Sequence, residues 1–311
     1  VKQDRNILVL ACSVLLAPQS QTLAWSGLHW PLSAFWLAWV VAALFALSML
    51  REPLQRGTGL AHVLALATVS LVYGLALARV AEAAELGADW QFMAALLPLG
   101  VLVLLTRRWP AAGTFPLARE FPAYARLWFI PASVALILAW VESLSLSGDS
   151  APLRYMPLLN PADLPQLVGL LVAAHCFNLR QHPALPALFA AAGFAWLSMA
   201  ALRAVHQYTG LPWSPLMLES GLVQATLTVV WSIVGVSAWI VGSRRRLWSL
   251  WLVGAIVLAV VLVKLALMDR QYVGNLTGIV SFIAVGLLLV AVGRIAPTPP
   301  RHPGPEPEST P

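Results

Sequence analysis

Residues 220–242 read SGLVQATLTVVWSIVGVSAWIVG, a stretch that contains no charged side chain. About 20 apolar residues in an α-helix cover the ~30 Å hydrocarbon core of a bilayer. This stretch is therefore long enough to cross a membrane. The stretches 31–50, 184–202 and 274–293 are equally free of charge. Together the four predict a protein built from membrane-spanning helices.

The composition of the whole chain agrees with this interpretation. Of its 311 residues, 59% are hydrophobic and only 10% are charged, whereas an ordinary soluble domain carries about 25% charged residues. The net charge of +6 is compatible with nucleic-acid binding only if the basic residues gather on one soluble face. Here they lie in short loops between apolar runs. A water-soluble domain and a nucleic-acid partner are both excluded.

We expect an all-α fold, a polytopic transmembrane helix bundle of about ten spans that occupies residues 1–296. The candidate spans are 7–25, 31–50, 60–78, 91–106, 127–144, 164–179, 184–202, 220–242, 247–268 and 274–293. Pro18 and the polar residues after it interrupt the first span, which leaves open whether it crosses completely. Residues 297–311 are rich in proline and polar residues, and this composition predicts a disordered cytoplasmic tail.

The basic residues predict the orientation of these spans, because cytoplasmic loops carry an excess of lysine and arginine. If the N-terminus is cytoplasmic and all ten spans cross, most of the 19 basic residues fall on the cytoplasmic side. They are Lys2, Arg5, Arg51, Arg56, Arg107, Arg108, Arg119, Arg126, Arg180, Arg244, Arg245, Arg246, Arg294 and Arg301. The pattern predicts a multi-pass protein of a bacterial inner (plasma) membrane with both termini in the cytoplasm.

The longest cytoplasmic connection combines apolar and basic residues. Phe115, Leu117, Arg119 and Phe121 lie within 111–123. An amphipathic segment of this kind is typical of chain that lies in the membrane interface. We therefore expect it to lie flat on the membrane surface.

The sequence contains none of the local motifs that mark common soluble enzymes. It has no glycine loop ending in Lys–Ser/Thr, no HExxH, no paired CxxC and no GxSxG. The catalytic residues are accordingly unknown, and no cofactor or metal is predicted. Membrane lipids are the expected partners, with an anionic amphiphile or other membrane proteins as further candidates.

Polar residues are concentrated at the predicted outer ends of three late spans, where ionisable groups are costly and often functional. Gln224 and Lys264 are expected at similar depths, within roughly 10 Å of the outer boundary at 1.5 Å of rise per residue. Adjacent antiparallel helices would bring them together. The residues of this candidate polar pocket are Arg203, His206, Glu219, Ser220, Gln224, Lys264 and Asp269.

Two interpretations of this cluster remain open. One is an outward-facing pocket for an anionic headgroup, a sugar phosphate or a carboxylate. The other is structural: Lys264 snorkels to the interface, Arg203 and Asp269 are boundary residues, and polar contacts join helices.

The C-terminal third resembles a known family. The run HQYTGLPWSPLMLESGLVQATLTVVWSIVGV at 206–236, the basic turn SRRRLW, VVLVKLALMD at 260–269 and GIVSFIAVGLLLVAVG at 278–293 resemble the C-terminal region of a bacterial family of predicted membrane proteins, domain of unknown function 2339. The resemblance implies location and architecture, and no catalytic residues. Members of that family often have a soluble N-terminal extension, so it is open whether an N-terminal region is missing here.

Two functions from different classes follow from the sequence. The first is a non-enzymatic role in transport or as a scaffold for envelope assembly. The second is an envelope enzyme that acts on a lipid-linked sugar or other amphiphile, with Arg203, His206, Glu219 and Lys264 as its polar centre. The sequence leaves transporter, scaffold and enzyme open, together with the ligand and the oligomeric state.

Overall fold

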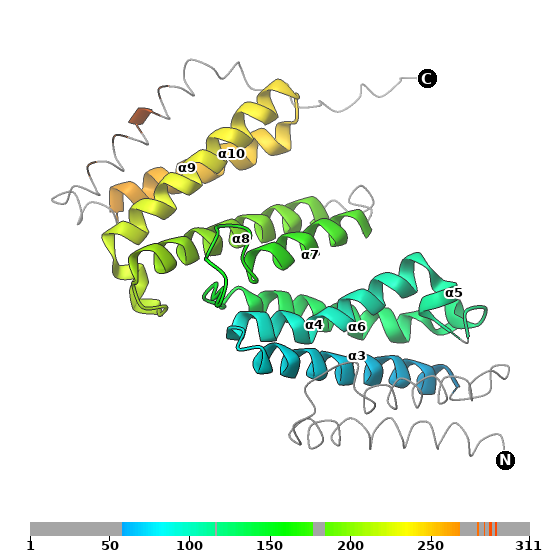
Figure 1. The fold of residues 1–311 in the computed structure, drawn as a ribbon. Coiled ribbons are helices and arrows are strands. Elements are labelled where there is room, and N and C mark those ends of the chain that lie inside the picture. The colour runs from blue at the N-terminus through cyan, green and yellow to red at the C-terminus, as the bar shows by residue number, and fades with distance from the viewer. Residues whose placement is uncertain are drawn as a thin grey trace, which may run out of the picture. The chain divides into compact units, whose positions relative to one another are not determined.

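The computed structural model describes residues 58–115, 117–176 and 184–267, and the single positions 279, 283, 286, 287 and 290. Within this part of the chain every regular element is a helix (Figure 1). The expected all-α class is therefore confirmed for these residues. The elements are α3 Thr58–Ala83, α4 Ala88–Arg108, α5 Pro110–Gly113, α6 Phe121–Ser143, α7 Asp163–Cys176, α8 Ala184–Thr209, η1 Pro215–Glu219, α9 Gly221–Arg244 and α10 Trp248–Leu267.

Six of these helices are long and apolar enough to cross a membrane: α3, α4, α6, α8, α9 and α10. They contain all of the candidate spans 60–78, 91–106 and 184–202, nearly all of 220–242, and most of 127–144 and 247–268. Helix α7 falls within 164–179 apart from its first residue, and with 14 residues it is shorter. The candidate spans 7–25 and 31–50, nearly all of 274–293, and the tail 297–311 lie outside the described residues. The expected count of about ten spans thus remains a prediction.

The helix surfaces have the character expected in lipid. Large apolar side chains remain exposed along α6, where Ile130, Ile137 and Leu138 are each about three-fifths exposed (61%, 59% and 63%). Soluble monomers rarely expose contiguous apolar surface of this kind. A bilayer provides the apolar surroundings that this surface requires.

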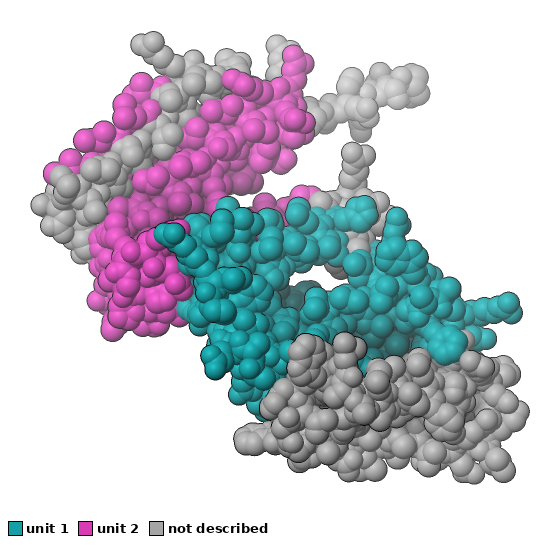
Figure 2. Space-filling view, in the orientation of Figure 1, with its two compact units in different colours: residues 1–185 teal, residues 186–311 magenta. Residues whose placement is uncertain are grey.

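The chain divides into two compact units, residues 1–185 and 186–311 (Figure 2). In the first unit, α3 packs along α4, and α6 contacts both helices. In the second unit, α10 packs along α9, and η1 contacts α9. The candidate polar residues that the structure describes all belong to the second unit.

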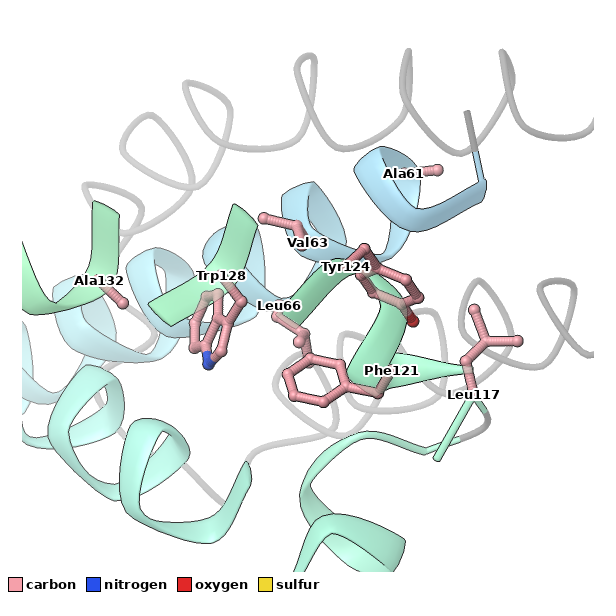
Figure 3. Packing of buried hydrophobic residues seen from close by; sticks show 8 residues of the cluster. All are labelled: Ala61, Val63, Leu66, Leu117, Phe121, Tyr124, Trp128 and Ala132. Carbon is pink, nitrogen blue, oxygen red and sulfur yellow. The ribbon is translucent and has the colours of Figure 1, made fainter. Parts of the chain in front are cut away.

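The core of the first unit forms where α6 begins (Figure 3). His62 on α3 is fully buried, and its Nδ1 lies 2.7 Å from the hydroxyl of Tyr124 on α6. One turn further along α6, the indole N–H of Trp128 donates to Thr106 Oγ1 on α4 (3.1 Å). These two hydrogen bonds join all three helices.

The connection between α4 and α6 contributes two of its apolar side chains to the core, and its position flat on the membrane surface stays a prediction. Leu117 is 1% exposed and Phe121 is 4% exposed, because both side chains pack into the core (Figure 3). Gly113 allows the turn, since a Cβ at this position would lie 2.5 Å from the backbone nitrogen of Thr106. Only Phe115 and Arg119 of the four residues remain exposed.

Small residues set the close packing of α9 against α10. A Cβ at Gly242 would lie 2.3 Å from the backbone nitrogen of Trp251, and one at Gly254 would lie 2.5 Å from that of Trp239. Close backbone approach through small residues is a common way to pack membrane helices, because dispersion contacts drive their association. This packing brings the polar residues of α9 within reach of α10.

Candidate functional site

Lys264 is buried inside a predicted span and turns toward the neighbouring helix. Its side chain is on α10 and is 8% exposed. The Nζ atom donates to the hydroxyl oxygen of Thr228 (2.7 Å) and to the backbone oxygen of Gln224 (3.1 Å), both on α9. The structure therefore brings Gln224 and Lys264 together.

The polar face of α9 continues inward from this contact. Gln224, Thr228 and Ser232 follow one another at intervals of four residues and are 8%, 0% and 0% exposed. The Thr228 hydroxyl donates to the Gln224 backbone oxygen (2.8 Å), and the Ser232 hydroxyl donates to the Thr228 backbone oxygen (2.7 Å). Such bonds satisfy the hydroxyl protons and leave the lone pairs of the hydroxyl oxygen directed outward. In Thr228 this oxygen accepts from Lys264.

The side-chain amide of Gln224 fixes the start of α9. Its Nε2 donates to the backbone oxygen of Leu218 within η1. Pro215 at the start of η1 provides a fixed φ angle for this short turn. Gln224 thus makes two contacts: its side-chain amide binds the η1 turn between α8 and α9, and its backbone oxygen accepts a hydrogen bond from Lys264.

Arg203 on α8 is fully buried (0% exposed). A hydrogen bond between α8 and α9 lies further back along the same helix. The indole N–H of Trp231 on α9 donates to the Ser198 hydroxyl on α8 (3.0 Å). Arg203 lies five residues further along α8, and Thr226 lies five residues back along α9. At 1.5 Å per residue both positions are about 7.5 Å from that hydrogen bond. Arg203 and Thr226 thus each lie about one and a half turns from that hydrogen bond along their own helices.

Trp231 contacts α10 as well as α8. Its side chain packs against Val261 and Leu265 of α10 and against the ring of Phe194 of α8, with a centroid separation of 5.3 Å. Lys264 is adjacent to Leu265 in sequence. Two basic side chains of the second unit, Arg203 on α8 and Lys264 on α10, are thus buried.

The remaining described candidates lie near the connection between α8 and α9. His206 Nδ1 contacts the backbone oxygen of Leu211, and its ring lies against Trp213 with centroids 5.6 Å apart. Glu219 is exposed at the end of η1, and Ser220 is half-buried where α9 begins. Asp269 lies outside the described residues. Of the four residues in the enzyme hypothesis, Arg203 and Lys264 are thus buried, whereas Glu219 is exposed.

Several residues of this centre were not identified from the sequence. Thr228 and Ser232 continue the i, i+4 series that begins at Gln224, and this spacing places them on one helical face. That series was the available signal. No sequence pattern indicated a role for Trp231, because that role depends on contacts with two other helices.

No group of three or more His, Cys, Asp or Glu side chains is placed to hold a metal ion in the part of the chain that the structure describes. The chemistry that the centre offers is hydrogen bonding and positive charge in apolar surroundings. Both favour an anionic group with several acceptor oxygens.

Comparison with known families supplies the context for this centre. A family described as predicted membrane protein, domain of unknown function 2339 (DUF2339), matches residues 5–299. The chain belongs to this family. The DUF2339 match includes the C-terminal third and extends well upstream of it. No curated protein and no solved structure matches the chain.

Proposed function

We propose that this DUF2339 protein is a non-enzymatic transporter of an anionic amphiphile in a bacterial inner membrane. In this proposal about ten spans cross the bilayer, both termini are cytoplasmic, and the polar centre opens toward the outer side. The observation that carries the proposal is the buried Lys264, which is held by Thr228 and Gln224 inside a helix long enough to span.

The energetic argument concerns the cost of charge at membrane depth. A charged side chain in a transmembrane helix costs several kcal/mol. Arg203 and Lys264 are two such side chains, both buried in the second unit. A phosphate or carboxylate that binds there gains charge-assisted hydrogen bonds from both. An apolar tail is accommodated by the exposed apolar surfaces of the same helices.

The polar face of α9 supports transport over a scaffold role. Gln224, Thr228 and Ser232 extend the polar surface by two helical turns from the predicted outer end toward the middle of the span. A scaffold requires only that α9 and α10 remain packed, and the glycine contacts already provide this.

The test measures lipid movement across the bilayer. The full chain is reconstituted into phosphatidylcholine vesicles that contain fluorescent NBD-phosphatidylglycerol, and dithionite quenching reports how fast the label reaches the outer leaflet. We expect the wild-type protein to accelerate this movement, and Lys264→Met to reduce the acceleration at least tenfold. Arg79→Gln is the control, because Arg79 is a partly exposed cation paired with Glu82, and it should behave as wild type.

Three results would contradict the proposal. Wild-type protein that leaves the rate of NBD-phosphatidylglycerol movement unchanged removes the transport role. A folded Lys264→Met protein with the wild-type rate shows that Lys264 is a structural contact only. Equal rates for NBD-phosphatidylcholine would contradict selectivity for an anionic headgroup.

A further inference from the structure

The connection between α6 and α7 is an ordered segment that buried side chains hold in place (Figure 1). Asp89, at the start of α4, is 3% exposed, and its Oδ2 accepts hydrogen bonds from the backbone nitrogens of Gly148 (2.6 Å) and Asp149 (2.8 Å). The backbone nitrogen of Gly87 donates to the oxygen of Ala151 (3.1 Å). The first half of the connection is thereby fixed to the turn between α3 and α4.

The second half of the connection is fixed to α7 and α6. Asn160 Oδ1 accepts from the backbone nitrogens of Ala162 (3.0 Å) and Asp163 (2.8 Å). Gln166 Nε2 donates to the Ser143 hydroxyl (2.8 Å), which joins the start of α7 to the end of α6. All four of these polar side chains, counting Asp163, are at most 3% exposed.

Between these two anchors the chain exposes apolar side chains. Residues 153–159 read LRYMPLL, and the exposed fractions are 63% for Leu153, 54% for Met156, 40% for Leu158 and 61% for Leu159. A loop in water gains nothing from large apolar side chains that it holds outward, because each exposed apolar surface costs about 25 cal/mol per Å² relative to burial. The anchored backbone prevents these side chains from folding inward.

We propose that residues 153–159 insert into the lipid interface at this end of the first unit. The segment joins the end of α6 to the start of α7, so it lies where a helix leaves the bilayer. Ile137, Leu138 and Val141 of α6 and Leu164 of α7 are likewise exposed on the two helices that the segment joins. The lipid that covers these helices thus also covers the segment.

The charge of the segment fits this occupant. Arg154 is exposed among the apolar residues, and 153–159 contains no acidic residue. Arginine side chains extend to the headgroups while their stems remain among apolar groups. Lipid phosphates provide the matching negative charge.

The test measures the depth of a spin label in the full-length protein in phosphatidylcholine–phosphatidylglycerol vesicles. Labels are attached at Leu153→Cys and Leu159→Cys, one at a time, with Cys12 and Cys176 replaced by serine. Both positions are largely exposed, so the substitutions disturb no core. We expect collisions with oxygen to exceed those with the water-soluble nickel complex NiEDDA at both positions. Ala84→Cys, an exposed position in the neighbouring α3–α4 connection, is the control and should favour NiEDDA.

The other outcomes contradict the proposal. Labels at 153 and 159 that collide mainly with NiEDDA place the segment in water. Immobile labels that both reagents fail to reach place it against a second copy or another protein. The first anchor is tested separately: Asp89→Asn should increase the mobility of the label at 153 and reduce its preference for oxygen, whereas the label at Ala84 should show little change.

Discussion

The hydroxyl of Thr228 accepts a hydrogen bond from the ammonium group of Lys264 at 2.7 Å and donates its own proton to the Gln224 backbone oxygen at 2.8 Å. One hydroxyl thus connects a buried cation on α10 to the backbone of α9. Buried hydrogen bonds to charged groups contribute about 1.5–3 kcal/mol, and an abandoned partner costs the desolvation energy as well.

A double-mutant cycle between these two residues should reveal their coupling. We expect Thr228→Val to lower the free energy of unfolding by about 1–3 kcal/mol, because Lys264 loses a buried acceptor. When Lys264→Met is already present, Thr228→Val should cost far less. Thermal or denaturant unfolding in detergent measures all four proteins. Thr226→Val, on the exposed side of α9, is the control, and additive effects at 228 and 264 would refute the coupling.

A second prediction concerns the hydrogen bond between α3 and α6 in the first unit. Tyr124→Phe removes the hydroxyl that lies 2.7 Å from Nδ1 of the buried His62, so we expect a loss of about 1–3 kcal/mol. Tyr73→Phe provides a matched comparison, because the buried Tyr73 hydroxyl has no hydrogen-bond partner among the described residues. It should be neutral or slightly stabilising. Equal losses in the two variants would show that the His62 contact contributes nothing specific.

The close approach of α9 and α10 predicts a difference between two glycines. A Cβ at Gly254 would lie 2.5 Å from the backbone nitrogen of Trp239, whereas one at Gly193 on α8 meets nothing within 4 Å. We expect Gly254→Ala to destabilise the protein by about 1–3 kcal/mol, as overpacking usually does. Gly193→Ala should be neutral or stabilising by up to about 1 kcal/mol through helix propensity. Melting temperatures in detergent test both.

Hydrophobic runs predicted the helices well, because length and the absence of charge are local properties of the sequence. The depth argument placed Gln224 opposite Lys264, and Lys264 Nζ donates to the Gln224 backbone oxygen. The same reasoning was unable to recognise Leu117 and Phe121 as core residues. An amphipathic mixture looks the same whether its apolar side faces lipid or the first turns of α3 and α6.

The buried acids of the first unit were missed for a related reason. Asp89 and Asp163 resemble ordinary loop acids in sequence, yet both are buried because backbone N–H groups donate to them. For Asp163 a local signal existed, since Asn160 precedes it by three residues and accepts from the backbone nitrogens at the start of α7. For Asp89 the donors come from residues 148 and 149, and such a distance leaves no local pattern.

The last prediction concerns which sides of the membrane the ends of α9 reach. This helix has 24 residues, and at 1.5 Å per residue it is about 36 Å long, enough to cross a hydrocarbon core of ~30 Å. The connection at Gly210 and the turn at Arg244–Arg246 should therefore lie on opposite sides. The three exposed arginines favour the cytoplasm for the turn. Reporter fusions at the two positions test this: alkaline phosphatase should be active at Gly210 and inactive after Arg246. The same side for both would contradict a transmembrane α9 and with it the depth assigned to Lys264.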